Sequence, residues 1–373
     1  MPIRSFIAML LLTPLTLAQE TAPPLFAADT PIIDYQNPQL PDYGRIGMVV
    51  SPEKLAGEIG LDMLKQGGNA IDAAVATGFA LAVTLPRAGN LGGGGFMLVH
   101  LAETDEQIFI DYRETAPAAA SRDMFLNADG TVNKAKAYFS RQAAGVPGTV
   151  AGLVHAQTQY GKLPLATVIQ PAIDLAEQGF DTPLALNMSL TSRAERLAMD
   201  PEAKRIYLQG TNNAPVPGAL FKQPDLARTL QRIRDKGHDG FYGGETAALI
   251  AGDMAANDGL ITTDDLASYR ALERSPVRGT FKEFEIVSVA PPSSGGVHVL
   301  QMLNLLEPYP LQSYGHNSAE YLHRLIESMK LAYADRSRYL GDPDQTVVPT
   351  EALISKEYAD KRRQLITANR ANS

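Results

Sequence analysis

Cysteine is absent from this chain of 373 residues. That absence excludes disulfides, thiolate nucleophiles, iron–sulfur clusters and zinc sites built on cysteine. It does not fix the compartment, because exported proteins can also avoid cysteine. The compartment must therefore be read from other features of the chain.

Positive charge is in short supply as well. The chain carries 33 basic and 41 acidic residues, a formal net charge of −8, and its longest basic run is Lys361-Arg362-Arg363. A nucleic-acid-binding surface needs clustered excess Lys and Arg. We therefore expect no nucleic-acid partner.

Common catalytic motifs are missing too. The sequence has no G-x-S-x-G elbow, no paired-histidine spacing such as H-E-x-x-H among its six histidines, and no G-x-x-x-x-G-K-[ST] loop. The run Gly92–Gly95 also fails the G-x-G-x-x-G spacing. These absences leave α/β-hydrolase, zinc-hydrolase and nucleotide-binding functions without support. The sequence therefore predicts no metal and no cofactor, and it offers no catalytic residue of its own.

The N-terminus has the features of a secretory signal. Arg4 supplies positive charge, residues 5–17 form a short apolar stretch, and small residues precede a cleavage point after Ala18. The stretch is too short and too interrupted by proline for a membrane span. A buried helix is the alternative, but residues 19–43 are proline-rich and aperiodic, which is typical of a linker. We expect a signal peptide over 1–18, a linker over 19–43, a main region over 44–373, and a periplasmic or secreted protein.

Hydrophobic periodicity predicts mixed helices and strands. We expect a first strand over 46–50, followed by a helix with Ser51 as its N-cap. Asn69 should cap a second helix that is apolar on nearly all sides and therefore buried. The further expected helices cover 149–159, 165–178, 223–236, 244–257, a segment ending at 306, and 318–339; the further strands cover 96–100 and 107–112, paired as a hairpin, and 283–290. This order favours a layered α+β or α/β fold.

Two positions are candidates for a functional site. Four consecutive glycines, Gly92–Gly95, persist where side chains do not fit, so they indicate either a tight loop against a strand or close approach to a ligand. The tight loop is the favoured interpretation. Arg113 follows an apolar strand and could present its planar guanidinium to a substrate carboxylate, or it could pair with the neighbouring Asp111 or Glu114.

Three other features have ordinary explanations. Residues 145–149 are expected to form a turn before a helix, and His298 is expected to be a partly buried histidine. Asp335 and Arg336 are neighbours on a helix, where a local ion pair is the usual explanation.

Several segments, taken in order, resemble the γ-glutamyltransferase (glutathione hydrolase) family, in the large-subunit portion of its proenzyme. The resemblance runs from about 44 to 343, and its motifs are Leu64–Thr77 (LKQGGNAIDAAVAT), Asn90–Leu98 (NLGGGGFML), Asp111–Pro117 (DYRETAP), Ser121–Phe125 (SRDMF), Gly145–Gly152 (GVPGTVAG), Gly259–Tyr269 (GLITTDDLASY), Pro291–Gly296 (PPSSGG) and Tyr333–Pro343 (YADRSRYLGDP). Each motif alone is weak, but their shared order makes a chance match improbable.

The resemblance implies an α+β fold of the N-terminal-nucleophile hydrolase type, an αββα sandwich of which this chain would form the large-subunit part. It implies a precursor that cleaves itself, so that the new N-terminal Thr of a small subunit attacks γ-glutamyl amides such as glutathione. The γ-glutamyl group would then pass to water or to acceptor amino acids or dipeptides. Arg113 matches the family's arginine for the α-carboxylate of the glutamyl group, and the glycine loop becomes scaffold beside the site.

One departure from the family pattern bears on activity. The processing site is expected to contain Thr-Thr-His, but Thr262-Thr263 is followed by Asp264 and lies inside a matched motif. We therefore expect the nucleophile to lie outside this chain and the chain alone to be inactive. Two alternatives remain open. One is a related acylase, either a cephalosporin acylase or a poly-γ-glutamate transpeptidase, and the other is an inactive, truncated binding module.

Overall fold

The computed structural model describes residues 41–368 and 370–371. The chain divides into two compact units, Met1–Ile46 and Gly47–Ser373. The predicted signal peptide and most of the predicted linker lie outside the described residues. In the described part, no helix has both the length and the apolar character needed to cross a membrane.

The second unit begins without the strand predicted over 46–50, so that prediction is wrong. Among the described residues, this run forms no hydrogen-bonded ladder with any strand. Met48 and Val50 are exposed, whereas Val49 packs close to Gly60 of the first helix, α1 (Lys54–Lys65).

The N-cap of α1 also differs from the prediction. Glu53 is the cap, because its carboxylate accepts hydrogen bonds from the N–H groups of Leu55 (3.2 Å) and Ala56 (2.9 Å). Ser51 lies two residues earlier, and its hydroxyl accepts the N–H of Glu53 at 3.3 Å.

Helix α2 (Ala70–Thr84) is confirmed in its start and in its burial. The Asn69 side chain accepts from the N–H groups of Ile71 and Asp72, and Asp72 accepts the N–H of Asn69 at 2.6 Å, which completes a capping box. Ala73, Val75 and Phe79 are all buried, and Ala73 and Val75 lie on different sides of the helix because successive residues are rotated by about 100°. Helix α2 therefore lies inside the core, in contact with α1, α4 (Thr149–Tyr160) and α5 (Leu165–Gln178).

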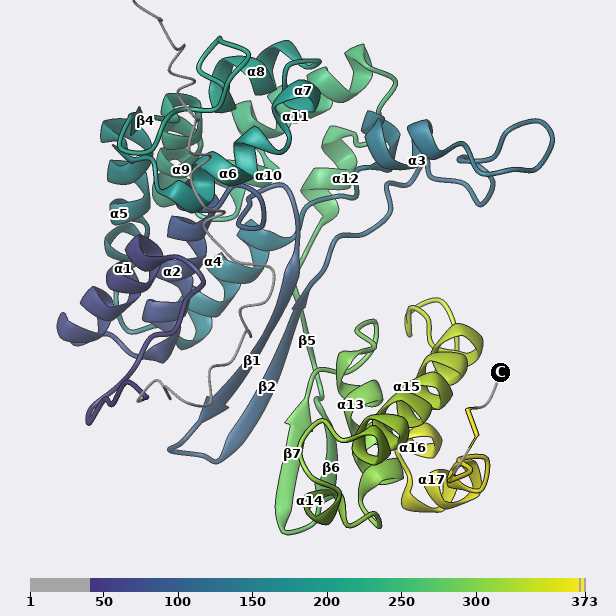
Figure 1. Ribbon diagram of the computed structural model, residues 1–373. Coiled ribbons are helices and arrows are strands. Elements are labelled where there is room, and N and C mark those ends of the chain that lie inside the picture. Colours follow the sequence, from purple (N-terminus) through teal and green to yellow (C-terminus); the bar gives the residue numbers. More distant parts are fainter. Residues whose placement is uncertain (1–40, 369, 372–373) are drawn as a thin grey trace, which may run out of the picture. The chain divides into compact units, whose positions relative to one another are not determined.

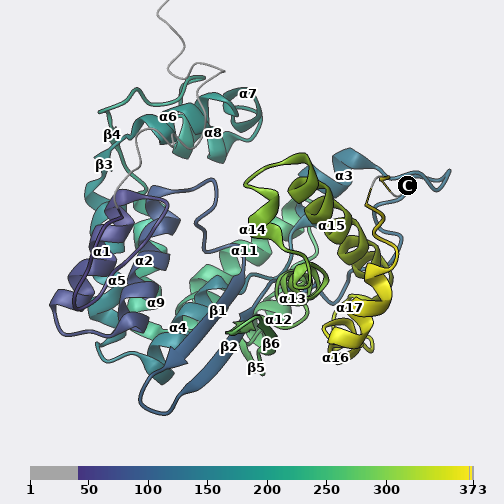
Figure 2. The ribbon, with the colours of Figure 1, turned by 60° about the horizontal axis from the view of Figure 1, so that its bottom comes forward.

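The predicted hairpin is confirmed as β1 (Gly95–Leu101) and β2 (Glu106–Tyr112), which pair antiparallel with Gly95 opposite Tyr112. A short strand that the sequence did not reveal, β5 (Leu272–Arg274), adds to the other edge of β2. Helix α4 contacts both long strands and covers one face of the hairpin, with α2 and α5 beyond it (Figures 1 and 2). Val99, Ile108 and Ile110 are buried on that face.

A second antiparallel hairpin consists of β6 (Val277–Phe281), which was not predicted, and β7 (Phe284–Ser288), which was. Helix α13 (Gly295–Leu306) packs against both of its strands and against α15 (Ala319–Tyr339) and α17 (Lys356–Arg363) (Figure 1). This part has its own small core, centred on Val277, Val297 and Leu300.

The interpretation of Asp335 as a local ion-pair partner is wrong. Its carboxylate is buried and pairs with Arg362 of α17 at 3.1 Å, and it accepts a hydrogen bond from Gln301 of α13 at 2.9 Å. The next residue on α15, Arg336, reaches Ser294 instead. His298 was expected to be partly buried, but it is buried, with its ring centroid 5.0 Å from that of Tyr333.

The remaining elements are mostly helical. Helices α5, α9 (Pro224–Lys236) and α11 (Gly244–Ala256) match their predictions within two residues. The other elements are α3 (Lys134–Phe139), η1 (Arg141–Ala143), β3 (Phe180–Asp181), α6 (Leu184–Thr191), α7 (Ala194–Leu197), α8 (Pro201–Tyr207), β4 (Leu220–Phe221), α10 (Asp239–Tyr242), α12 (Thr263–Ser268), α14 (Leu311–Tyr314) and α16 (Thr350–Leu353). All strand pairs of the described residues are antiparallel, so the fold class is α+β, as predicted.

Candidate functional site

Arg113 lies directly after β2, where the chain leaves the sheet. Its side chain is exposed, and its guanidinium carbon lies 5.8 Å from the centre of the Phe96 ring. Within the described part of the chain, neither Asp111 nor Glu114 forms an ion pair with it, and Asp111 pairs with Arg274 at 2.8 Å. The local ion pair that the sequence left open is therefore wrong, and the guanidinium faces solvent with a single aromatic neighbour.

Two cavities meet at Arg113. The larger, of about 690 Å³, is lined by charged side chains that include Arg113, Arg274 and Asp344. The smaller, of about 420 Å³, is also lined by the 113–117 segment and has Met124 and Phe125 in its wall. Arg113 is therefore the basic side chain that both cavities share.

Three of the other charged side chains at the larger cavity, Arg274, Asp111 and Asp344, are paired with one another. Arg274 holds Asp344 through two hydrogen bonds of 3.1 and 2.5 Å, and its Nε–H donates to Asp111. The hydrogen bond from Arg274 lowers the pKa of Asp344 below its ordinary value. A third arginine, Arg270, donates to the carbonyl oxygens of Ala267 and Tyr269. The guanidinium of Arg113 forms neither kind of contact in the described residues, so it can offer its planar donors to an external carboxylate.

The glycine loop fixes the end of β2 from the other side. The carbonyl oxygen of Gly93 accepts the N–H groups of Gly148 (2.7 Å) and Thr149 (3.0 Å). A Cβ on Gly94 would lie 2.5 Å from the carbonyl oxygen of Tyr112, which is closer than such contacts allow. The tight-loop interpretation is confirmed, and the loop abuts the residue before Arg113.

The predicted turn over 145–149 belongs to the same arrangement. Val146 pairs with Thr115 through two backbone hydrogen bonds of 2.8 and 3.3 Å, and Gly148 is the N-cap of α4. A Cβ on Gly148 would lie 1.9 Å from the carbonyl oxygen of Tyr112. These contacts hold the segment that carries Arg113 against the start of α4.

Sequence reasoning missed the residues that hold the backbone of Arg113. The hydroxyl of Tyr269 donates to the carbonyl oxygen of Arg113 at 2.8 Å, and the carboxylate of Asp111 accepts the N–H of Arg113 at 3.1 Å. Tyr269 lies inside one of the motifs quoted for the family resemblance, but no local pattern connects it to a residue 156 positions away.

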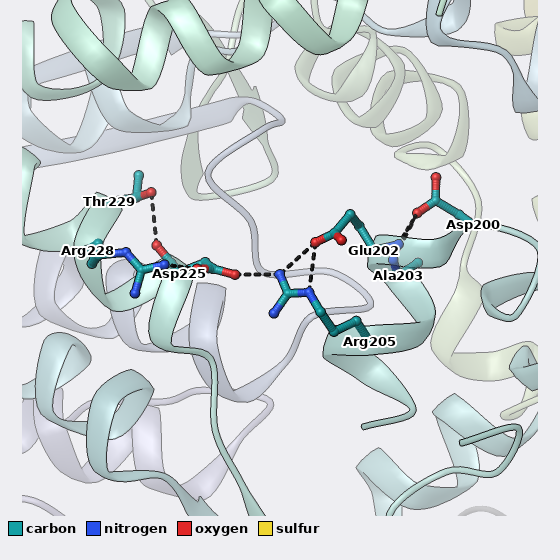
Figure 3. A network of polar contacts seen from close by, with 7 residues as sticks. All are labelled: Asp200, Glu202, Ala203, Arg205, Asp225, Arg228 and Thr229. Atoms are coloured by element: carbon teal, nitrogen blue, oxygen red, sulfur yellow. Dashed lines mark hydrogen bonds and ion pairs between the residues drawn. The ribbon is translucent and has the colours of Figure 1, made fainter. Parts of the chain in front are cut away.

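Another cavity, of about 710 Å³, lies between the 86–92 loop, α8 and the start of α9. Figure 3 shows the charged network on its wall, in which Arg205 binds Glu202 at 2.6 Å and Asp225 at 2.5 Å. Asp225 also pairs with Arg228, and the hydrogen bond from Arg205 lowers the pKa of Asp225 below its ordinary value. Because these charges neutralise one another, this cavity is a weaker candidate for binding a charged ligand than the one at Arg113.

The described residues contain no group of three or more His, Asp or Glu side chains that could hold a metal ion.

Comparison with known proteins places this arrangement in a family. Residues 56–373 match the sequence model named Gamma-glutamyltranspeptidase. The chain is 45% identical to the glutathione hydrolase proenzyme of Escherichia coli (strain K12) over 325 residues, which are 87% of this chain and 56% of the relative. It is 41% identical to the acylase ACY 1 proenzyme of Pseudomonas sp. (strain SE83), over 92% of this chain and 62% of the relative. The chain thus spans little more than half the length of these relatives.

A solved structure supports the same relationship. The gamma-glutamyltranspeptidase of Helicobacter pylori superposes with a TM-score of 0.87 at 43% identity, over 89% of this chain and 95% of the compared chain. The predicted fold of the N-terminal-nucleophile hydrolases is confirmed by this similarity. The order of the elements, the glycine loop against β2 and the extent of these matches lead to one conclusion: the chain belongs to the gamma-glutamyltranspeptidase family.

Proposed function

We propose that this chain is part of an enzyme that cleaves γ-glutamyl amide bonds, as in glutathione and its conjugates. The enzyme would transfer the γ-glutamyl group to water, or to amino acids and peptides. Family membership supports the reaction class, and the E. coli relative is named for glutathione hydrolysis. The observation that carries the proposal is the exposed guanidinium of Arg113, which pairs with no carboxylate of the described residues, at a cavity where Arg274 is already held by Asp111 and Asp344.

Arg113 would bind the α-carboxylate of the γ-glutamyl group. A guanidinium can hold a carboxylate through two parallel hydrogen bonds, which fixes both the position and the orientation of the ligand. Phe96 lies beneath the guanidinium and leaves its outward N–H groups available. The substrate would enter the cavity that Arg113 shares with Arg274 and Asp344.

A second polypeptide from the same precursor would complete the active site. The relatives named above are called proenzymes and are longer than this chain, which supports a precursor that is cut into two subunits. The N-terminal Thr of the second subunit would attack the γ-glutamyl carbonyl, with its own α-amine as general base, because that amine titrates near neutral pH. Water or an acceptor amine would then resolve the γ-glutamyl ester.

The compartment is a separate proposal. The apolar segment over 1–18 supports export and removal of a signal peptide, and residues 19–43 would then form a linker before the main region over 44–373. The protein would be periplasmic or secreted. N-terminal sequencing of the exported protein tests this assignment: the mature chain should begin close to Gln19, and an intact Met1 would contradict it.

An acylase acting on related substrates is the second candidate, because one relative is named an acylase proenzyme. The test compares kcat/KM of the complete, processed protein for γ-glutamyl-p-nitroanilide and for a glutaryl-cephalosporin. We expect kcat/KM to be at least tenfold higher for the γ-glutamyl donor. A higher kcat/KM for the cephalosporin would contradict this proposal and support an acylase instead.

The precursor itself can be tested through the gene. The reading frame should continue past codon 373 into a segment with Thr-Thr-His or a close variant. A stop codon at that point would contradict the proposal of a second subunit.

A further inference from the structure

The backbone of Arg113 is held at both of its polar groups by side chains. Arg113 follows the last residue of β2, so it has no strand neighbour to satisfy its N–H and C=O groups. The Asp111 carboxylate accepts its N–H at 3.1 Å, and the Tyr269 hydroxyl donates to its carbonyl oxygen at 2.8 Å. These two bonds fix the peptide groups on either side of the Arg113 Cα, from which the guanidinium extends.

Asp111 is itself fixed by ion pairs. Its side chain is only 6% exposed, and its second oxygen accepts the Nε–H of Arg274 at 2.8 Å. Arg274 lies on β5 and uses its remaining donors to hold Asp344. The carboxylate that accepts the N–H of Arg113 therefore belongs to a charge-assisted chain that links β2, β5 and the loop after α15.

Tyr269 is fixed by a column of stacked rings. Its ring lies parallel to that of Tyr242, with 5.5 Å between centroids and 9° between planes, and Tyr242 stacks on His238 at 4.4 Å. The Nε2 of His238 lies 3.1 Å from the carbonyl oxygen of Tyr269. The hydroxyl of Tyr242 donates to the carbonyl oxygen of Pro147 at 2.8 Å. Burial raises the pKa of Tyr269 above its ordinary value, so its hydroxyl stays protonated and remains a donor.

We propose that Asp111 and Tyr269 are positioning residues for substrate binding, and that they act through Arg113 without touching the substrate themselves. The inference rests on the proposed function, in which Arg113 binds the substrate carboxylate. A displacement of about 1 Å in a binding group can cost a large factor in rate, because the donors no longer meet the carboxylate. The two hydrogen bonds that Asp111 and Tyr269 form with the Arg113 backbone keep the guanidinium in one position over the Phe96 ring, at the cavity that Arg113 lines.

The decisive variant is Tyr269→Phe in the complete, self-processed protein. It removes one hydroxyl and keeps the ring stack on Tyr242. The matched control is Tyr160→Phe, whose hydroxyl donates to Glu273 of β5 at 2.6 Å without contacting Arg113. With γ-glutamyl-p-nitroanilide as donor, we expect Tyr269→Phe to raise KM by about threefold to tenfold, the size of one lost hydrogen bond, with kcat changed less than KM. Tyr160→Phe should change KM by less than about twofold.

Asp111→Asn supplies a second, independent variant. It should raise KM in the same direction, because a neutral amide oxygen is a weaker acceptor than a carboxylate and no longer forms an ion pair with Arg274. Its control is Asp72→Asn, which alters a buried aspartate that also accepts backbone N–H groups but lies in the capping box of α2. That control should lower thermal stability and leave KM nearly unchanged.

A double-mutant cycle separates positioning from general support of the fold. If Tyr269 acts through Arg113, Tyr269→Phe should change kcat/KM by less than about twofold once Arg113 has been replaced by Ala. The same fold-change in both backgrounds would overturn the inference, as would a Tyr269→Phe effect no larger than that of Tyr160→Phe. In either case the proposed function would still be supported if Arg113→Ala lowers kcat/KM for the γ-glutamyl donor. Both proposals fall if the complete wild-type protein turns over no γ-glutamyl donor.

Discussion

Replacement of Arg113 tests the candidate site most directly. Its guanidinium is exposed, pairs with no carboxylate in the described part of the chain and contacts the Phe96 ring. Removing such a side chain should change the free energy of unfolding by no more than about 0.5 kcal/mol. Any large effect on activity would then come from lost substrate contacts and not from lost folding.

The expected size follows from the contact itself. A charge-assisted, bidentate bond between a guanidinium and a carboxylate contributes about 1.5–3 kcal/mol, and each 1.4 kcal/mol is a factor of ten. Arg113→Ala should therefore lower kcat/KM for γ-glutamyl donors by roughly tenfold to a hundredfold or more. Arg113→Lys should recover part of this loss, because an ammonium keeps the charge and loses the two parallel donors.

The assay is steady-state hydrolysis of γ-glutamyl-p-nitroanilide by the complete protein, with a gel that separates the two subunits. Self-cleavage should proceed normally in both variants, since it depends on the Thr nucleophile and not on the glutamyl carboxylate. Arg122→Ala is the control, because Arg122 lies nearby in the chain and is almost fully exposed. If Arg113→Ala keeps donor kinetics within twofold of wild type, Arg113 does not bind the substrate.

Three further predictions concern the scaffold. Gly94→Ala should destabilise the protein by about 1–3 kcal/mol in denaturant unfolding, because the new Cβ would lie 2.5 Å from the carbonyl oxygen of Tyr112; an unchanged midpoint would refute the close approach. Burial acts to raise the pKa of Asp72, but hydrogen bonds from Gln157 and three backbone N–H groups outweigh it, so the pKa lies below its ordinary 3.8. Ionised Asp72 therefore stabilises the fold fully above pH 3.8 and progressively less as the pH falls below that value. Asp72→Asn should lower Tm clearly at pH 7 and much less at pH 3. Equal losses of Tm at both pH values would contradict this reasoning. Helix α15 carries an exposed apolar stripe made of Leu322, Ile326, Met329 and Tyr333. The chain expressed alone should aggregate through this stripe, and Ile326→Glu, which changes a side chain that is 51% exposed, should increase the soluble monomer in gel filtration; a monodisperse wild-type chain would count against the stripe as the cause.

Elements with strong local signals could be predicted from the sequence. Helix α2 has its cap, its apolar composition and its boundaries within a short stretch, and the hairpin of β1 and β2 has alternating strands joined by a polar turn. Helix α5 was predicted at both ends. In each case the deciding interactions join residues that are close in the chain.

Short elements and distant partners could not be predicted in this way. Strand β5 has three residues and exists only because the edge of β2 is free to pair with it. The apolar run at 46–50 was predicted as a strand from its composition, yet it pairs with no strand of the described residues. Asp335 has a neighbour of opposite charge on its own helix, yet the fold brings Arg362 to it instead.

The candidate site shows the same division. The sequence by itself determined Arg113 as a carboxylate-binding candidate and the glycine loop as scaffold, because residue type, order and family resemblance are all properties of the chain. Only the tertiary structure decided that Arg113 is free of its acidic neighbours and that Asp111 and Tyr269 hold its backbone. The hydroxyl of Tyr269 and the carbonyl of Arg113 are 156 positions apart, and no local pattern encodes a contact that forms only when α12 packs beside the end of β2.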